Sequence, residues 1–273
     1  MNGSEITVVQ AVVLAVVQAL TEFLPVSSSA HLILVPKVFG WPDQGLTFDL
    51  IMHLGSLTAV VAYFRADLWA MLRGWTGSVT RRPSHDVAAA RLAWLVILAT
   101  LPAVLAGLAF GDLVETQARN PKLIAVTLAV FGLLLFAADR LGRRLRGVDA
   151  VGWRAALLIG IAQACALVPG VSRSGATMTA GMALGFTREA AARFSFLLSV
   201  PVITAGSLLH GVEVALHGGN GVGLLPLLSG FVVAAACAYL CIAFFMRYIL
   251  RHSLTVFVVY RLLLSATIVY LLA

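Results

Sequence analysis

The chain has 273 residues, of which 60% are hydrophobic and 11% are charged, and its mean hydropathy is +0.97. This composition excludes an ordinary soluble domain and is typical of a protein embedded in a lipid bilayer. The formal net charge of +7 does not indicate nucleic-acid binding, because the basic residues lie beside apolar segments, where they act as topology signals. We therefore interpret residues 1–273 as a single integral membrane domain surrounded by membrane lipids.

The apolar segments follow the same order twice along the chain. Two short pieces near 6–20 and 28–40 are followed by longer spans near 46–72, 88–110 and 121–139. An interrupted pair near 153–185 is then followed by spans near 188–210, 221–246 and 253–272. This order predicts an all-α polytopic membrane protein with six transmembrane helices and two re-entrant helix pairs.

Similar polar motifs interrupt the two short pairs. Residues 18–31 read Gln-Ala-Leu-Thr-Glu-Phe-Leu-Pro-Val-Ser-Ser-Ser-Ala-His, and residues 163–175 read Gln-Ala-Cys-Ala-Leu-Val-Pro-Gly-Val-Ser-Arg-Ser-Gly. We predict two repeats, near 5–140 and 152–272. A re-entrant pair returns to its own side and three spans cross an odd number of times, so the second repeat is expected to be inverted. The two breaks are then expected to meet near the midplane.

Basic residues are divided unequally between the two expected sides of the membrane. Lys37, Arg119 and Lys122 fall on one side, whereas the other holds the arginines near 65–91, 140–154, 188–193 and 247–251. The positive-inside rule assigns the arginine-rich side to the cytoplasm. Both termini and the first break are then expected on the outer side, and the second break enters from the cytoplasm.

Glu22 is an ionisable residue inside an apolar segment, where a charge costs about 2.5–3.5 kcal/mol at a helix centre. Gln18 lies four residues earlier, on the same helical face. One interpretation is an interfacial pair in contact with water. The other is a pair that lines a polar cavity, where the carboxylate positions a proton or holds a divalent cation. Because Mg²⁺ usually shares phosphate oxygens with its substrate, this pair would suffice only with ligands from the substrate.

Arg173 lies at the expected start of a half-helix. Amides at a helix N-terminus favour anions, and a guanidinium can bind phosphate or carboxylate with two hydrogen bonds. Gly170 permits a tight turn, and further donors are supplied by Ser172, Ser174 and Thr177. The alternative is helix capping with a salt bridge from Arg173 to Glu22.

Ser27, Ser28 and His31 form a third candidate group. A serine hydroxyl becomes a nucleophile when a base takes its proton, and histidine suits that role near neutral pH. Either serine can share a helical face with His31. The alternatives are helix capping by the serines and a structural role for the histidine. The weaker candidates are His53, Asp49, His210, His217 and Arg261, of which Arg261 is expected to pair with a neighbour or to extend to the membrane surface.

Together the motifs resemble the two signatures of the undecaprenyl-diphosphate phosphatases, the bacitracin-resistance membrane family. The resemblance rests on Gln18-x-x-x-Glu22-Phe23-Leu24-Pro25-Val26-Ser27-Ser28-Ser29-x-His31 and on Pro169-Gly170-x-Ser172-Arg173-Ser174-Gly175-x-Thr177. Length, hydropathy and the run 195–201 extend it over the whole chain. It implies hydrolysis of a polyprenyl diphosphate to the monophosphate at the outer face of a bacterial inner membrane. This reaction recycles the lipid carrier for cell-wall synthesis and confers bacitracin resistance.

The resemblance also implies roles for individual residues. A divalent cation, Mg²⁺ or Ca²⁺, is expected near Glu22 and Gln18, and Arg173 is expected on the diphosphate. Ser28 or His31 takes part in the chemistry. Gln18 stands where many members have Glu, which weakens a direct bond between this position and a metal.

Several alternatives stay open on the sequence. Attack on the terminal phosphorus by Ser28 or Ser27, helped by His31, competes with attack by water activated by His31 or Glu22. A transporter or lipid-carrier flippase is the rival function, because broken helices in inverted repeats suit transport equally well. The expected partners are the polyprenyl diphosphate, membrane lipids and a second copy of the chain in a homodimer.

Overall fold

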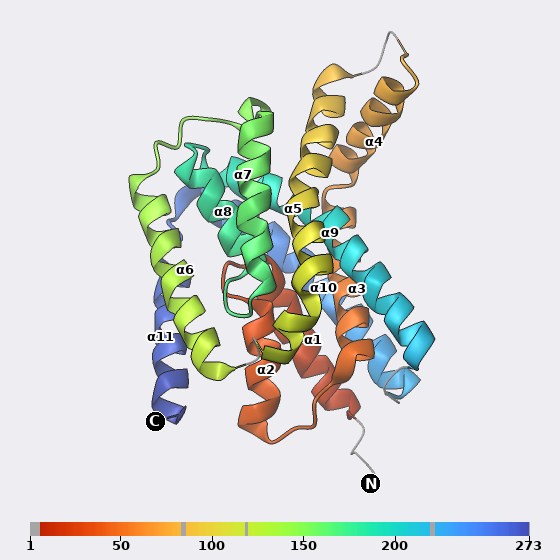
Figure 1. Cartoon of the computed structure of the whole chain (residues 1–273), viewed down its shortest axis with the longest axis vertical. Helices are drawn as coiled ribbons and strands as arrows, with labels where there is room; N and C mark the ends of the chain where they lie inside the picture. The colour runs from red at the N-terminus through yellow and green to blue at the C-terminus, as the bar shows by residue number, and fades with distance from the viewer. Residues whose placement is uncertain (1–5, 83–85, 118–119, 219–221, 273) are drawn as a thin grey trace.

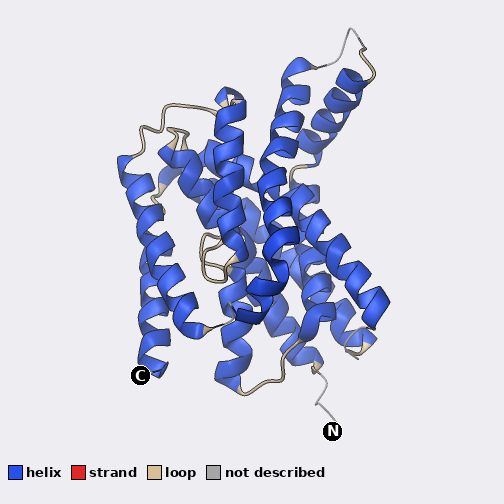
Figure 2. Cartoon of the chain, viewed as in Figure 1, coloured by secondary structure: helices blue, strands red, loops and turns tan. Residues whose placement is uncertain are grey.

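A computed structural model describes residues 6–82, 86–117, 120–218 and 222–272 of the chain. Within these ranges the protein consists of helices and loops without a β-strand (Figure 2), which confirms the all-α prediction. Glu5, where the first repeat was expected to begin, and Arg119, one of the basic residues expected on the outer side, lie outside the described ranges.

The helices occur in the order that the hydropathy pattern predicts. The N-terminal half contains α1 (Val8–Phe23), α2 (Ser28–Phe39), α3 (Gly45–Tyr63), α4 (Arg65–Val79), α5 (Val87–Gln117) and α6 (Pro121–Leu141). The C-terminal half contains α7 (Trp153–Ala164), α8 (Arg173–Ala183), α9 (Arg188–His217), α10 (Leu224–Arg251) and α11 (Thr255–Leu272). Single 3-10 turns occur at Val148–Ala150 and Cys165–Leu167.

Five of the described helices are long and apolar enough to cross a membrane, namely α3, α5, α6, α9 and α10. The sixth predicted span, α11, is also apolar, but its described part is counted with the shorter apolar helices α1, α2 and α7. These lengths and compositions are those of a multi-pass membrane protein.

The span predicted near 46–72 is present as α3, which is long and apolar enough to cross a membrane, but it ends earlier than predicted because the structure divides this segment into two helices. Helix α3 ends at Tyr63, and α4 begins at Arg65 and packs along α5, where the two project from the upper end of the molecule (Figure 1). The physical reason is the change in composition, since Arg65 and Asp67 follow the apolar run. Charged residues favour a helix that leaves the apolar layer over one that continues through it.

The two broken helix pairs approach the middle of the molecule from opposite ends. In Figure 1, α1 and α2 occupy the lower part and α7 and α8 the upper part. The breaks are residues 24–27 and 168–172, and the pairs touch where the Ser174 hydroxyl of α8, just after the second break, donates to the Leu24 carbonyl at 2.9 Å. Packing between the halves is reciprocal. Helix α1 of the first half packs on α10 of the second, just as α7 of the second packs on α5 of the first. Helix α3 packs on α9, and α6 packs on α11.

Each break has a local cause. Pro25 lacks the N–H that a continuing α1 would need, so the helix ends at Phe23. In the second break Gly170 has a φ of +92°, and a Cβ there would lie 2.1 Å from the Thr127 hydroxyl oxygen. Only glycine fits such a position, so the second break depends on both backbone freedom and close packing.

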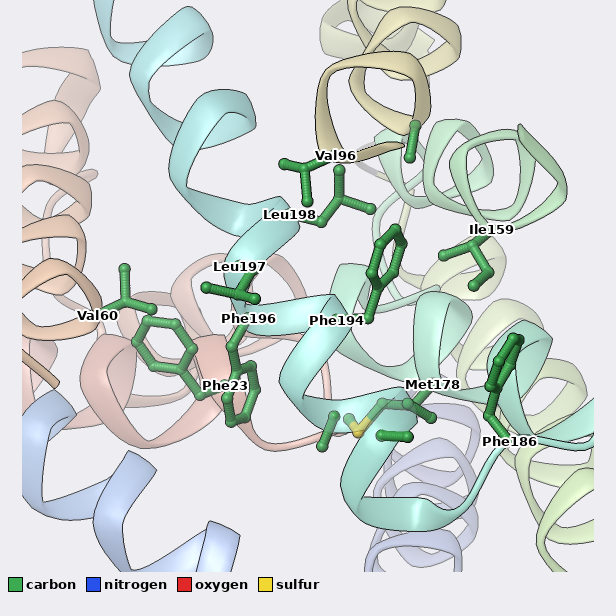
Figure 3. Packing of buried hydrophobic residues seen from close by; sticks show 14 of the residues in the cluster. Phe23, Val60, Val96, Ile159, Met178, Phe186, Phe194, Phe196, Leu197 and Leu198 are labelled. Carbon is green, nitrogen blue, oxygen red and sulfur yellow. The ribbon is translucent and has the colours of Figure 1, made fainter. Parts of the chain in front are cut away.

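An apolar core packs directly against the breaks. Phe23, the residue after Glu22, contacts Phe196 of α9 edge to face, with ring centroids 5.4 Å apart. Figure 3 shows Phe194, Phe196 and Leu197 of α9 among residues from both halves of the chain. Between helices surrounded by lipid, close packing of such side chains stabilises the contact, so this core holds α1 and α9 in a fixed relation.

Candidate functional site

The two breaks end in serines with the same unusual backbone conformation. Ser27 has φ 76° and ψ 95°, and Ser172 has φ 72° and ψ 115°. Each serine caps the following helix by accepting the backbone N–H three residues later. Positive φ in a residue other than glycine costs about 1–3 kcal/mol and is typical of functional sites. The two motifs therefore share a strained backbone as well as a similar sequence.

The residues that follow these serines meet at one carboxylate. The Ser28 hydroxyl donates to Glu22 Oε2 at 2.7 Å, and Arg173 Nη2 donates to Glu22 Oε1 at 3.2 Å. Gln18 Nε2 donates to Oε2 at 3.1 Å. Glu22 is 7% exposed, so its charge is held by side chains from both halves of the chain. The salt bridge from Arg173 to Glu22 that the sequence suggested is present.

These groups lie in a cavity of about 750 Å³. Its polar part includes Glu22, Ser27, Ser28, Ser172 and Arg173. Apolar side chains also line it, among them Leu32, Ile33, Val104, Leu108, Val202, Ile203 and Leu209. A cavity that combines charged and polar groups with apolar side chains is suited to a ligand with a polar head and an apolar body.

His53 is a cavity residue that the sequence indicates only weakly. Its Nε2 lies 3.8 Å from Glu22 Oε2, and its Nδ1 donates to the Asp49 carbonyl at 2.8 Å. Asp49 lines the same cavity, as does His210. The signal in the sequence was the spacing of Asp49 and His53, which places both on one face of α3. His217, another of the weaker candidates, has a side chain outside the described part of the structure.

His31 lies behind the cavity wall, in contrast to its predicted role as a base for Ser27 or Ser28. Its Nδ1 is 2.7 Å from the Ser27 carbonyl, and its Nε2 is 2.6 Å from the Tyr260 hydroxyl. The imidazole also stacks on the Tyr260 ring, with centroids 5.6 Å apart. A carbonyl oxygen can only accept, so Nδ1 is the donor and Nε2 accepts from tyrosine in the neutral ring. Both nitrogens of His31 are thus engaged, Nδ1 with the N-cap of its own helix α2 and Nε2 with α11.

Most predicted donors of the second motif also support the backbone. The Thr177 hydroxyl lies 2.7 Å from the Ser195 hydroxyl. The backbone carbonyl of Ser195 accepts a hydrogen bond from Arg173 Nη1 at 3.1 Å. Ser174 bonds the first break, and the Gly170 carbonyl accepts a hydrogen bond from Arg261. Of the residues predicted to bind substrate, Ser172 and Arg173 line the cavity, whereas Gly170, Ser174 and Thr177 do not.

The oxygen atoms near Glu22 suit a hard divalent cation. Gln18 Oε1 is buried and has no hydrogen-bond partner, so an oxygen atom beside the carboxylate is available as a ligand. No group of three or more His, Cys, Asp or Glu that could hold a metal occurs in the described part of the chain. The residues therefore fit a cation that takes most of its ligands from water and phosphate, which is how Mg²⁺ commonly binds.

Comparison with known families agrees with this geometry. The family model described as bacitracin resistance protein BacA matches residues 11–267 of the 273. The matched region contains both breaks and the side chains of Gln18, Ser28, His53 and Arg173 that surround Glu22.

Proposed function

The chain belongs to the bacitracin resistance protein BacA family, and on that basis we propose that it hydrolyses undecaprenyl diphosphate, or a related polyprenyl diphosphate, to the monophosphate and phosphate. The observation that carries the proposal is the contact of Ser28 and Arg173 with the two oxygens of Glu22 in one cavity. A nucleophile, a proton acceptor and an anion-binding group are what hydrolysis of a phosphoanhydride needs. The reaction recycles the lipid carrier for cell-wall synthesis and confers bacitracin resistance.

Ser28 is the nucleophile in this proposal. Its hydroxyl attacks the terminal phosphorus while the proton moves to Glu22 Oε2, 2.7 Å away. The bond between that phosphorus and the bridging oxygen breaks, and the polyprenyl monophosphate leaves with the bridging oxygen. A water molecule then cleaves the phosphoserine, and inorganic phosphate is released. Glu22 takes the proton here because His31 is engaged with Ser27 and Tyr260.

Arg173 supplies the anion-binding group. Its guanidinium bonds Glu22 and the Ser195 carbonyl in this structure, so it is held in place by α1 and α9. Arg173 is also the first residue of α8, and the N-terminus of a helix favours negative charge. Fixed donors of this kind act on the charge that develops on the phosphate oxygens in the transition state.

We also propose a divalent cation, Mg²⁺ or Ca²⁺, as a cofactor. Glu22 and Gln18 would hold it through oxygen atoms, and the diphosphate and water would supply its other ligands. When bound, such a cation neutralises phosphate oxygens and lowers the barrier to attack. The buried Gln18 Oε1 without a partner supports this assignment.

The cavity indicates how a lipid substrate reaches the site. From Glu22 it extends past Lys37 at the C-terminal end of α2, Trp41 in the following loop and His210 of α9. In Figure 1 the C-terminal end of α2 lies at the same end of the molecule as the start of α1 and the end of α11. The charge bias of the sequence assigns this end to the outer, periplasmic side of a bacterial inner membrane. We propose that the diphosphate enters from that side while the prenyl chain stays against the apolar wall and in the lipid.

Phosphate release from undecaprenyl diphosphate by detergent-purified protein tests the activity. We expect the wild-type chain to release phosphate, and Ser28→Ala, Glu22→Gln and Arg173→Met to lose most of that activity. Wild-type protein that is folded but inactive with and without Mg²⁺ or Ca²⁺ would contradict the proposal.

Rapid-quench labelling separates the two possible nucleophiles. With terminally labelled substrate, serine attack transfers the label to Ser28 before phosphate appears. Attack by water leaves the protein unlabelled and incorporates solvent oxygen into phosphate in the first turnover. Labelled protein that disappears in Ser28→Ala would support the serine.

Lipid transport is the second candidate function, favoured by the reciprocal packing of the two halves and the opposed helix breaks. Reconstituted vesicles distinguish it from hydrolysis. Movement of a polyprenyl phosphate between leaflets that persists in Ser28→Ala would support transport, whereas phosphate release without movement supports the hydrolase alone.

A further inference from the structure

Arg261 of α11 is a fully buried arginine at the junction of the two breaks. Its side chain is 0% exposed, and the hydrogen-bond partners that the structure gives it are all backbone carbonyls. They belong to Pro25 at 3.2 Å, Thr127 at 3.4 Å, Leu128 at 3.1 Å, Gly170 at 2.8 Å and Val171 at 3.0 Å. One side chain thus joins both breaks and α6.

Such an arrangement is unusual for a buried charge. Buried arginines are normally paired with a carboxylate, because an isolated charge is costly to remove from water. A guanidinium carries donors in a rigid planar fork, so it can bind several carbonyls at fixed angles. Lysine has a single ammonium on a flexible chain and cannot reproduce this pattern. Multiple fixed acceptors indicate that the geometry of the guanidinium, and not its charge alone, is used here.

The acceptors lie just before the two strained serines. Pro25 is two residues before Ser27, and Gly170 and Val171 are the two residues before Ser172. A backbone with positive φ persists only where the surrounding structure holds it in place. Arg261 bonds the chain immediately upstream of both strained positions, so it can hold both at once.

We propose that Arg261 is a positioning residue, which clamps the two breaks so that Ser28 and Arg173 meet at Glu22. This inference rests on the proposed function and deepens it. Arg261 does not line the cavity, so it acts through the backbone and not by contact with substrate. Ser28 and Arg173 each directly follow a strained serine, and any loosening of the breaks changes their position relative to Glu22.

The surroundings of Arg261 are consistent with a fixed clamp. A Cβ added at Gly175 would lie 3.1 Å from Arg261 Nη1, and one at Gly132 would lie 3.4 Å from Arg261 Cβ. The preceding residue, Tyr260, bonds His31, which in turn bonds the Ser27 carbonyl. Adjacent residues of α11 therefore hold the first break at two separate carbonyls.

Arg261→Lys tests the clamp with the charge retained, and Arg261→Met tests it with the charge removed. We expect kcat/KM for undecaprenyl diphosphate to fall about 10²-fold in Arg261→Lys, since a misplacement of about 1 Å has an effect of that size. Arg91→Met is the matched control, because Arg91 donates to the Val151 carbonyl, which belongs to neither break. Wild-type activity in a folded Arg261→Lys protein would overturn the proposal.

A double-mutant comparison separates positioning from general destabilisation. If Arg261 acts by positioning Ser28, the loss caused by Arg261→Lys should shrink at least tenfold in a Ser28→Ala background, because the nucleophile that it positions is absent. An equal loss in both backgrounds would overturn the proposal.

Distance measurements test the clamp without relying on activity. Spin labels at Val38→Cys on α2 and Ala183→Cys on α8 would be compared in wild-type and Arg261→Lys proteins, with Cys165, Cys237 and Cys241 replaced by alanine. Both label sites are exposed. We expect a broader or shifted distance distribution in Arg261→Lys. An unchanged distribution would overturn the clamp, whereas a wild-type protein that releases no phosphate would overturn only the proposed function.

Discussion

The two breaks share a backbone but differ in chemistry. Ser27 and Ser172 have nearly the same positive φ and cap their helices in the same way. The following residue is Ser28 in the first break and Arg173 in the second. The position of Glu22 in the first motif is occupied by Leu167 in the second. The same local backbone structure therefore presents a hydroxyl beside a carboxylate in the first break and a guanidinium in the second.

The site therefore needs residues from both halves of the chain. The first break alone places the hydroxyl of Ser28 against the carboxylate of Glu22 without a guanidinium, and the second alone has the guanidinium of Arg173 without a carboxylate beside it. Arg173 bonds Glu22 across the junction at 3.2 Å. If this comparison is right, changes at equivalent positions should have equal effects on stability and unequal effects on activity.

The largest loss is expected from Glu22→Gln. This change removes the proton acceptor of Ser28 and the partner of Arg173, so phosphate release should fall about 10³-fold. Glu189→Gln is the control, because Glu189 lies at the start of α9 and does not line the cavity. Residual activity above about one tenth of wild type would show that another group accepts the proton.

A slightly smaller loss is expected from Arg173→Met. Removal of one preorganised charged donor should lower kcat/KM about 10²–10³-fold, and Arg173→Lys should recover only part of it because lysine lacks the planar fork. Arg146→Met, which removes an arginine that bonds the Leu184 and Ala150 carbonyls, should remain active. Full activity in Arg173→Lys would mean that charge alone suffices.

An intermediate effect is expected from Gln18→Glu. A second carboxylate beside Glu22 should lower the Mg²⁺ or Ca²⁺ concentration for half-maximal activity about tenfold, since ligand charge controls affinity for such cations. Gln10→Glu places the same group at the start of α1, outside the cavity, and should leave the requirement unchanged. A chelator titration of each variant measures this. Equal shifts in both would contradict the assignment of the cation to the first break.

The smallest effects are expected from Ser27→Ala and Ser172→Ala. Each removes one helix cap, so each should lower the free energy of unfolding by about 1 kcal/mol. Thermal unfolding in detergent should therefore give similar shifts for the two variants. A large shift for only one of them would show that the two breaks are not structurally equivalent.

The sequence predicted the meeting of Glu22 and Arg173 but not the supports around it. Paired motifs and an odd number of spans between them are global features, so they indicate that the two breaks face each other. The role of Arg261 depends on which carbonyls α11 reaches, and His31 binds Tyr260 from the far end of the chain. Contacts across such separations are set by packing, which periodicity does not report.

The helix boundaries show the same limit. A hydropathy window cannot distinguish one long span from α3 followed by α4, because the apolar residues of α4 continue the pattern of α3. The separation depends on Arg65 and Asp67, and Asp67 also bonds Arg193 of α9. His53 was underestimated for a related reason, since its distance to Glu22 follows from how α3 packs on α1.

The central claim is that Glu22 and Arg173, from opposite halves of the chain, form one hydrolytic site. The most direct test compares phosphate release from undecaprenyl diphosphate by wild type, Glu22→Gln, Arg173→Met and the double variant. Groups that act as a unit give strongly non-additive losses. We predict that the activity of the double variant equals, within about threefold, the activity of the less active of the two single variants. Losses that multiply, or a folded wild type that releases no phosphate, would contradict the account.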